Sequence, residues 1–232
     1  MKVLYIGYYK DGSGWAQAAQ DWILALDAAG VDVVPRAYKL NNFNGSIPER
    51  IIELEKKSDR NCTHVIQHLL PHHMDFDGNF DRTIGLFFTE TSHFSNTSWP
   101  NKLNLMDEIW VTNKQMLKAC DNSGVNRPIY VVPYASNVSK FLESHKNFEL
   151  PKELDGNFLF YFIGEMNRRK NLGALIKAFH IEFDAGDPVS LVIKSGIPGA
   201  SPDESFAYIS KFCKDVKHGL KIYNSILDYK QE

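Results

Sequence analysis

Cysteine is scarce in this chain. The 232 residues contain three, Cys62, Cys120 and Cys213, which form no Cys-x-x-Cys pair. An odd number of widely spaced cysteines argues against a disulfide framework and favours free thiols in a reducing cytoplasm. No apolar run approaches the roughly 20 residues that span a bilayer. The apolar stretch after Met1 also lacks the length and the cleavage site of a signal peptide. We therefore expect a cytoplasmic protein with no transmembrane segment.

Positive charge is not in excess, since 26 Lys and Arg residues stand against 28 Asp and Glu residues. A nucleic-acid-binding domain ordinarily has a basic surplus, so we expect no nucleic-acid partner. Internal repeats and low-complexity segments are also lacking. At 44% hydrophobic residues the composition is that of an ordinary globular protein. The length allows one large domain or two small ones.

Strand and helix patterns alternate along the chain. Apolar strand patterns occur at 3–8, 31–37, 63–70, 83–88, 108–111 and 128–133. Helical patterns occupy 15–26, 47–57 and a stretch that Thr112 can cap and that ends near Gly124. A second cycle offers strands at 158–163, 189–194 and 220–223, a helix from Leu172 to Phe183, and a helix marked by Phe206, Ile209, Cys213 and Val216. Such runs predict a parallel α/β sheet. We place an N-terminal Rossmann-like domain at 1–145, a linker at 146–157 and a second, partial domain at 158–232.

The first predicted strand leads into a glycine-rich loop that contains Gly12, Ser13 and Gly14. Glycines here let a ligand approach the backbone, and the following helix can receive an anion at its N-terminus. The spacing is neither that of a P-loop nor that of the dinucleotide fingerprint. Because open α/β sheets bind ligands beyond the carboxyl ends of their strands, we assign this loop to ligand binding. The alternative is a turn that only connects strand to helix.

A second loop, after the predicted strand at 158–163, carries three consecutive cations, Arg168, Arg169 and Lys170, just before a helix. Backbone N–H groups at a helix start favour anions, and flanking cations strengthen that preference. This combination suits a diphosphate. The alternative is a basic turn exposed to solvent.

Two other patterns admit a metal site. Asp75-Phe76-Asp77 has carboxylates at a spacing that can bind a divalent cation, and His64, His68, His72 and His73 form a cluster of imidazoles. The acidic pair lies in a polar loop, and the histidines lack a Cys or carboxylate at ligand spacing. We expect no metal at either place.

One motif begins at Gly164 and reads Gly-x5-Lys-Asn-Leu-x2-Leu-Ile-x-Ala-Phe. Earlier runs read Asp-Glu-Ile-Trp-Val-x-Asn from Asp107 and Val-Val-Pro-Tyr from Val131. In order and spacing these stretches resemble the group 1 (family four) retaining glycosyltransferases, which have the GT-B fold. The resemblance implies two Rossmann-like domains and places the chain in polysaccharide biosynthesis.

The resemblance also implies residue roles. In that family a basic pair holds the phosphates of the donor, and Arg169 and Lys170 match that pair. Donor contact by Gly12, Ser13 and Gly14 fits the same scheme. Glu90 and His93 follow the strand at 83–88, where the family has a polar residue that touches the sugar or the acceptor. We take both as candidate catalytic residues, although a loop hydrogen bond would equally explain them.

The implied reaction moves a sugar from a nucleotide-sugar donor to a saccharide or other hydroxyl acceptor, with retention. It needs no metal or other cofactor. The family usually has two glutamates eight positions apart later in its second domain, and no such pair occurs here. We therefore expect an incomplete second domain, completed by a missing C-terminal segment or a partner chain, and an inactive chain by itself. The alternatives are a non-catalytic sugar- or protein-binding module and, less in keeping with the missing fingerprint, another nucleotide-using Rossmann enzyme.

Overall fold

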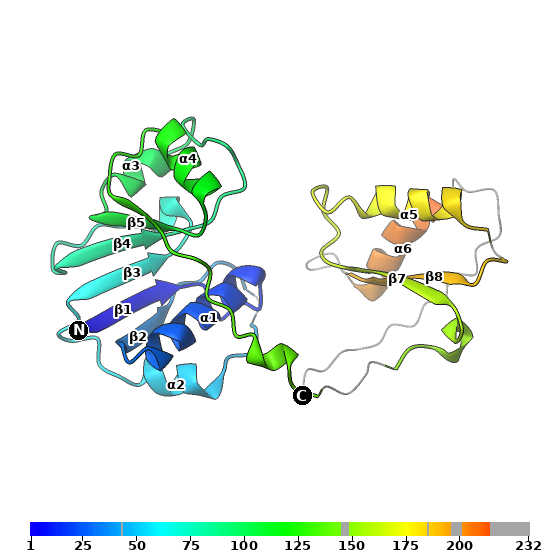
Figure 1. Ribbon diagram of the computed structural model, residues 1–232, viewed down its shortest axis with the longest axis horizontal. Helices are drawn as coiled ribbons and strands as arrows, with labels where there is room; N and C mark the ends of the chain where they lie inside the picture. The colour runs from blue at the N-terminus through cyan, green and yellow to red at the C-terminus, as the bar shows by residue number, and fades with distance from the viewer. Residues whose placement is uncertain (43, 145–148, 185, 196–200, 214–232) are drawn as a thin grey trace. The chain divides into compact units, whose positions relative to one another are not determined.

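The computed structural model describes residues 1–42, 44–144, 149–184, 186–195 and 201–213. The chain divides into two compact units, Met1–Ser144 and His145–Glu232 (Figure 1). Each unit is described by itself. Within the described residues, no helix has the length and apolar character needed to cross a membrane.

The first unit is built on a six-stranded sheet in which every strand is parallel to its neighbours. The spatial order is β2-β1-β3-β4-β5-β6, and Figure 1 shows the strands side by side. The strands are β1 Lys2–Gly7, β2 Asp32–Ala37, β3 His64–His68, β4 Arg82–Leu86, β5 Glu108–Val111 and β6 Ile129–Val131. The prediction of a Rossmann-like parallel α/β sheet for this part of the chain is confirmed.

The strand order reverses between β1 and β3, which are neighbours in space, with Val3 opposite His64 and Gly7 opposite His68. Connections on the two sides of this point run in opposite directions along the sheet. In open α/β sheets a crevice forms at such a reversal, outside the carboxyl ends of the strands. The residues that directly follow β1, β3 and β4 are therefore placed to line a site.

Four α-helices accompany the sheet: α1 Gly14–Ala28, α2 Glu49–Glu55, α3 Trp99–Leu103 and α4 Lys114–Asn122. The hydroxyl of Ser13 caps α1 by accepting from the Ala16 N–H, and Gly30, with φ +81°, follows its end. The predicted cap of α4 was wrong. Asn113, in extended conformation, accepts from the Met116 N–H at 2.9 Å, whereas the Thr112 hydroxyl contacts the Met116 sulfur. The short α3 was not predicted.

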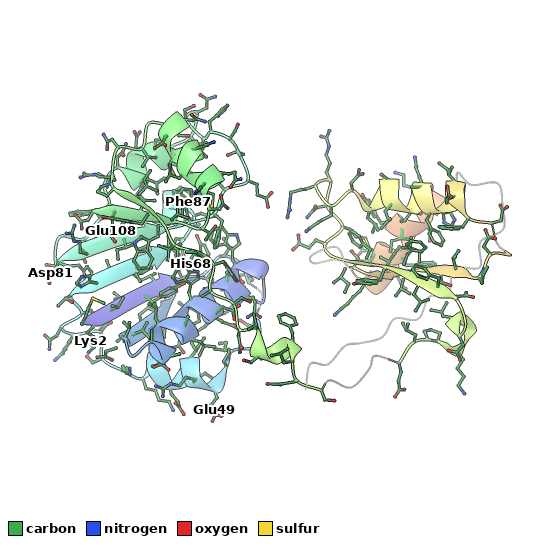
Figure 2. All side chains as sticks on the ribbon, in the orientation of Figure 1. Lys2, Glu49, His68, Asp81, Phe87 and Glu108 are labelled. Carbon is green, nitrogen blue, oxygen red and sulfur yellow. The ribbon has the colours of Figure 1, made fainter. Side chains whose placement is uncertain are left out.

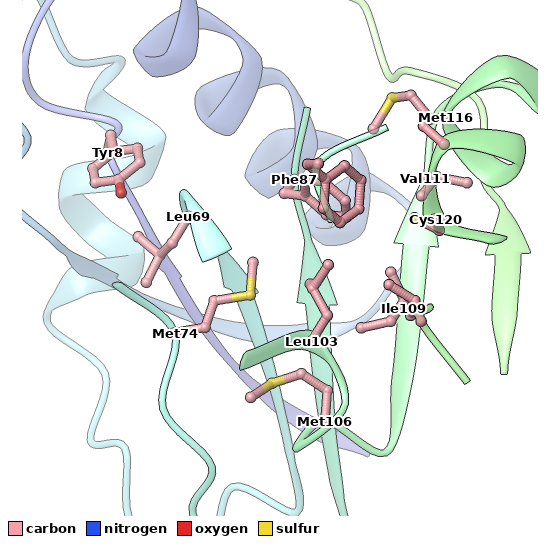
Figure 3. Close-up of a cluster of buried hydrophobic side chains, with 13 residues drawn as sticks. Tyr8, Leu69, Met74, Phe87, Leu103, Met106, Ile109, Val111, Met116 and Cys120 are labelled. Carbon is pink, nitrogen blue, oxygen red and sulfur yellow. The ribbon is translucent and has the colours of Figure 1, made fainter. Parts of the chain in front are cut away.

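The sheet is covered on both faces, which explains its continuous apolar strands. On one face α1 and α2 pack over a cluster that includes Tyr5, Trp22 and Ile66. A cluster on the other side involves α3 and α4 and includes Phe87, Leu103 and Cys120 (Figure 3). Both clusters reach the carboxyl ends of the strands, so the residues there are held against a packed core.

The second unit contains two parallel strands, β7 Phe158–Ile163 and β8 Val189–Lys194, and two helices, α5 Leu172–Glu182 and α6 Pro202–Cys213. Among the described residues of this unit, the buried apolar side chains are Met166, Leu172 and Ile176. These elements match the predicted second cycle as far as Cys213. Val216 and the predicted strand at 220–223 lie outside the described residues. That this unit is a second Rossmann-like domain remains a prediction.

Candidate functional site

The carboxyl edge of the sheet next to the β1–β3 reversal gathers aromatic rings and imidazoles. Tyr8 follows β1, His68 ends β3, and Phe88 follows β4 (Figure 2 labels His68). Because the strands are parallel and adjacent, residues distant in sequence meet here. Trp15, in the first turn of α1, completes the group, with its ring centroid 5.6 Å from that of Tyr8.

His68 is fully buried beneath this aromatic layer. Its Nδ1 lies 2.6 Å from the hydroxyl of Tyr5, while its Nε2 is buried and has no hydrogen-bond partner among the described residues. The rings of Trp15 and Phe88 lie over it, at centroid distances of 5.5 and 5.1 Å. Burial lowers the pKa of His68 to about 3, since a buried charge is poorly solvated. His68 is therefore a neutral imidazole with one polar atom left to satisfy.

Tyr8 connects β1 to the short 3₁₀ helix η1 Pro71–His73. Its hydroxyl accepts the Leu70 N–H at 3.0 Å and lies 2.5 Å from Nδ1 of His73. Burial is the main cause that raises the pKa of Tyr8 to about 12, so the phenol keeps its proton. The ring of Tyr38, just after β2, stacks on His73 at 5.2 Å.

The glycine loop is held mainly by hydrogen bonds and contacts with other residues of the chain. Asp11 accepts from both the N–H and the hydroxyl of Ser13, at 2.9 and 2.5 Å. Gly12 has φ +71°. Its backbone touches that of Gly45, and a Cβ added to Gly45 would lie 2.4 Å from Gly12 Cα. Gly12 and Ser13 thus have structural roles in the turn and the helix cap. Gly14 is different, because an added Cβ there would meet nothing within 4 Å. Ligand contact by this loop remains a prediction.

Glu90 and His93, the predicted catalytic residues, lie in the segment after β4, at the same edge of the sheet as His68. Both side chains are exposed. Their placement after a strand end was foreseen, and their catalytic role remains a prediction.

The basic loop of the second unit follows β7. Arg168, Arg169 and Lys170 are exposed. The aliphatic part of the Lys170 side chain passes close to Gly164, because a Cβ added to Gly164 would lie 3.8 Å from Lys170 Cδ. Asn171 precedes α5 with φ +51° and gives its first turn no side-chain hydrogen bond. The first N–H groups of a helix need acceptors, and an anion can provide them.

The residues of the two metal-like motifs either pair with other side chains or lie at opposite ends of a strand. Asp75 forms an ion pair with Lys102 at 2.8 Å, and Asp77 accepts hydrogen bonds from Asn79. His64 lies at the amino end of β3 and His68 at the other end. Within the part of the chain that the structure describes, no three His, Cys, Asp or Glu side chains are grouped to hold a metal ion.

One cavity, of about 230 Å³, opens at the opposite edge of the sheet. It is lined mostly by apolar side chains, with His64, Arg82 and Glu108 among the polar ones. These three residues start β3, β4 and β5. The cavity thus lies at the amino ends of the strands, away from the edge where a parallel sheet binds ligands, and we do not assign the site to it.

Sequence reasoning missed the centre of this site. It placed Trp15 in the apolar stripe of a helix, and it weighed His68 and His73 only as metal ligands. A usable signal was present, because Tyr8, Tyr38, the histidines after 67 and Phe88 all stand at or just beyond predicted strand ends. The sequence did not show which of these ends are neighbours.

Comparison with known proteins identifies no family for this chain. No known protein family matches the sequence, and no curated protein matches it. The function is therefore argued from the site itself.

Proposed function

We propose that this protein is a glycosyltransferase that moves a sugar from a nucleotide-sugar donor to an acceptor hydroxyl with retention. The observation that carries the proposal is the carboxyl-edge site beside the β1–β3 reversal, where aromatic rings surround neutral imidazoles. The resemblance of the motifs from Asp107, Val131 and Gly164 to retaining glycosyltransferases supports it.

The chemistry of the first unit suits an uncharged, hydroxyl-rich ligand. Trp15 and Phe88 are half-buried aromatic surfaces, on which the C–H faces of a sugar ring can pack. His68 and His73 are imidazoles whose pKa values burial lowers, so they act as neutral hydrogen-bonding groups. We assign acceptor binding to this edge.

The second unit supplies the donor contact in this proposal. Lys170 and Arg169 would neutralise the diphosphate beside the uncapped start of α5. During transfer, the bond between the sugar C1 and the diphosphate oxygen breaks, and its electrons leave with the nucleoside diphosphate. The acceptor oxygen bonds to C1, and its proton passes to an oxygen of the departing diphosphate. Fixed cations at the leaving group stabilise its developing charge without a metal ion.

Glu90 and His93 are the candidate catalytic side chains. A carboxylate near the sugar stabilises positive charge that develops on its ring, and an imidazole orients the acceptor hydroxyl. Both residues follow β4 at the edge assigned to the acceptor.

The experiment measures nucleoside-diphosphate binding, and nucleoside-diphosphate release from a panel of nucleotide-sugars, by the protein together with the C-terminal segment or partner chain expected to complete its second domain. Replacing Lys170 by Ala removes a charge-assisted hydrogen bond, so we expect binding to weaken by roughly 10- to 100-fold. The matched control, Arg168→Ala, is expected to bind nearly as the parent does, because two cations converge at a helix start and the third faces solvent. Glu90→Gln should lower diphosphate release and leave binding intact.

The outcomes are distinct. Nucleoside-diphosphate binding that survives Lys170→Ala but not Arg168→Ala contradicts the residue assignment. Saccharide binding without diphosphate release from any donor would indicate a non-catalytic sugar-binding module instead. Product with an inverted anomeric centre, seen by NMR, would contradict retention.

A further inference from the structure

His72 and His73 are two adjacent imidazoles in η1, at the carboxyl end of β3, with ring centroids 4.2 Å apart. Each has its Nδ1 engaged by another side chain. Nδ1 of His73 lies 2.5 Å from the Tyr8 hydroxyl, and Nδ1 of His72 lies 3.2 Å from the indole nitrogen of Trp99. These contacts determine where each ring carries its proton.

The tautomer of His73 follows from the partners of Tyr8. The hydroxyl of Tyr8 already accepts the Leu70 N–H at 3.0 Å, so its own proton is available to donate to Nδ1. A neutral imidazole that accepts at Nδ1 carries its hydrogen on Nε2. His73 therefore presents an Nε2–H group.

The tautomer of His72 follows from Trp99. An indole N–H can only donate, so Nδ1 of His72 must accept and its proton resides on Nε2. For His73, burial and the neighbouring His72 act in the same direction and lower its pKa.

The surroundings of the pair favour a neutral ligand over an anion. Tyr38, 40% exposed, stacks on His73 at an interplanar angle of 26°, and Trp99 stacks on His72 at 23°. The nearby cation Lys102 is already paired with Asp75 at 2.8 Å. The negative charge of Asp11 acts on Tyr8. This charge would repel an anionic group at the pair.

We propose that His72 and His73 form a fixed pair of neutral Nε2–H donors that binds the hydroxyl oxygens of an uncharged saccharide, with the exposed ring of Tyr38 as an apolar contact. That this saccharide is the acceptor rests on the proposed glycosyltransferase function. The binding site itself does not, because the donor pair is set by hydrogen bonds within the first unit.

The first test is nitrogen-15 NMR of the histidine rings in the full chain. We expect both residues as neutral Nε2–H tautomers at pH 7. Maltose and cellobiose, added at millimolar concentration, should shift both Nε2 signals, while inorganic phosphate at equal ionic strength should leave them unchanged. An Nδ1–H tautomer at either residue would overturn the proposal, as would a response to phosphate alone.

The second test compares two substitutions at one position. In His73→Gln the amide nitrogen takes the place of Nε2, whereas in His73→Asn it takes the place of Nδ1. We expect His73→Gln to retain disaccharide binding and His73→Asn to weaken it by about two- to tenfold, the value of one hydrogen bond. Tyr8→Phe, which frees the tautomer of His73, should weaken binding to a similar extent. Thermal unfolding of each variant checks that the first unit remains folded.

Equal binding by the Gln and Asn variants and the parent would overturn the role of Nε2–H. The result is separable from the proposed function. If the protein binds disaccharides but transfers no sugar, the two histidine hydrogen-bond donors are supported and only their role in acceptor binding is contradicted. If the protein transfers sugar to a non-saccharide hydroxyl and binds no disaccharide, the saccharide site at His72 and His73 is contradicted and the glycosyltransferase function is supported.

Discussion

Buried histidines set the character of the site at the scale of single residues. His68 sits at a strand position that an apolar side chain would ordinarily fill, and the hydroxyl of Tyr5 satisfies one of its two nitrogens. The other nitrogen has no partner among the described residues. An unsatisfied buried polar atom costs stability, on the order of 1–3 kcal/mol. Its burial beneath the rings of Trp15 and Phe88 is what holds this imidazole neutral.

The neutral state of His68 predicts a pH dependence of stability. Its pKa falls from 6.5 to about 3 on folding, so the unfolded chain binds more protons between these values. The contribution of His68 is fully present above pH 6.5 and is lost as the pH falls toward 3. At pH 5 it is smaller than at pH 7.5 by about 2 kcal/mol.

The measurement is the free energy of unfolding of the first unit by urea at both pH values. Other titrating groups contribute as well, so the comparison is with the double variant Tyr5→Phe/His68→Leu, which removes both partners of the hydrogen bond. The double variant should show a smaller loss between pH 7.5 and pH 5. Equal losses in the parent and the variant would show that His68 is not held neutral.

At the scale of elements, the turn after β1 depends on two glycine backbones in contact. The Gly45 N–H donates to the Lys10 carbonyl at 2.7 Å, and Gly45 approaches Gly12 more closely than a side chain permits. This contact fixes the loop that leads into α1, whose first turn carries Trp15. The geometry of the aromatic layer over His68 thus depends on a loop contact more than thirty residues away in sequence.

A matched pair of substitutions tests this contact. Gly45→Ala places a Cβ 2.4 Å from Gly12 atoms, all of them backbone, so the loop must shift. We expect a loss of about 1–3 kcal/mol in the free energy of unfolding, as for other overpacked sites. Gly14→Ala, in the first turn of α1 with open space around it, should be neutral or slightly stabilising. Similar effects of both substitutions in chemical denaturation would contradict the contact.

At the scale of the whole molecule, each of the two compact units has its own buried core. The first unit has two large clusters on the faces of its sheet, whereas the cluster in the described part of the second unit has three buried side chains. A parallel sheet covered on both faces contains what a domain needs to fold alone. The predicted domain limit at 145 remains a prediction that expression of one unit can test.

Residues 1–144, expressed alone, should therefore fold. We expect a cooperative unfolding transition and a near-ultraviolet circular dichroism signal from the packed Trp22 and Trp110 rings, whose centroids are 5.9 Å apart. The control is the same transition in the full chain, monitored by the same signal. A fragment without that signal, or with a broad transition, would show that the first unit needs residues beyond 144.

Several elements could be predicted from the sequence because their signals are local. The strands at 108–111, 158–163 and 189–194 match the structure at both ends, since each is a short apolar run. The cap of α4 was misplaced by one residue, because Thr112 and Asn113 are both good caps and only backbone conformation separates them. The helix at Trp99–Leu103 was missed, because five residues are too few to show a helical period.

The sequence by itself determined that this chain forms parallel strands alternating with helices, because apolar runs and periodicity are properties of neighbouring residues. It also placed Glu90 after a strand end, and Arg169 and Lys170 in the loop that joins a strand to the next helix, which is where parallel sheets bind ligands. Only the tertiary structure decided that β1 lies beside β3, since strand order depends on how whole elements pack. That adjacency brings Tyr5 to His68 and Tyr8 to His73, across 63 and 65 residues of chain. Burial keeps His68 neutral and lowers the pKa of His73, and those long-range hydrogen bonds orient both rings. No local pattern encodes either effect.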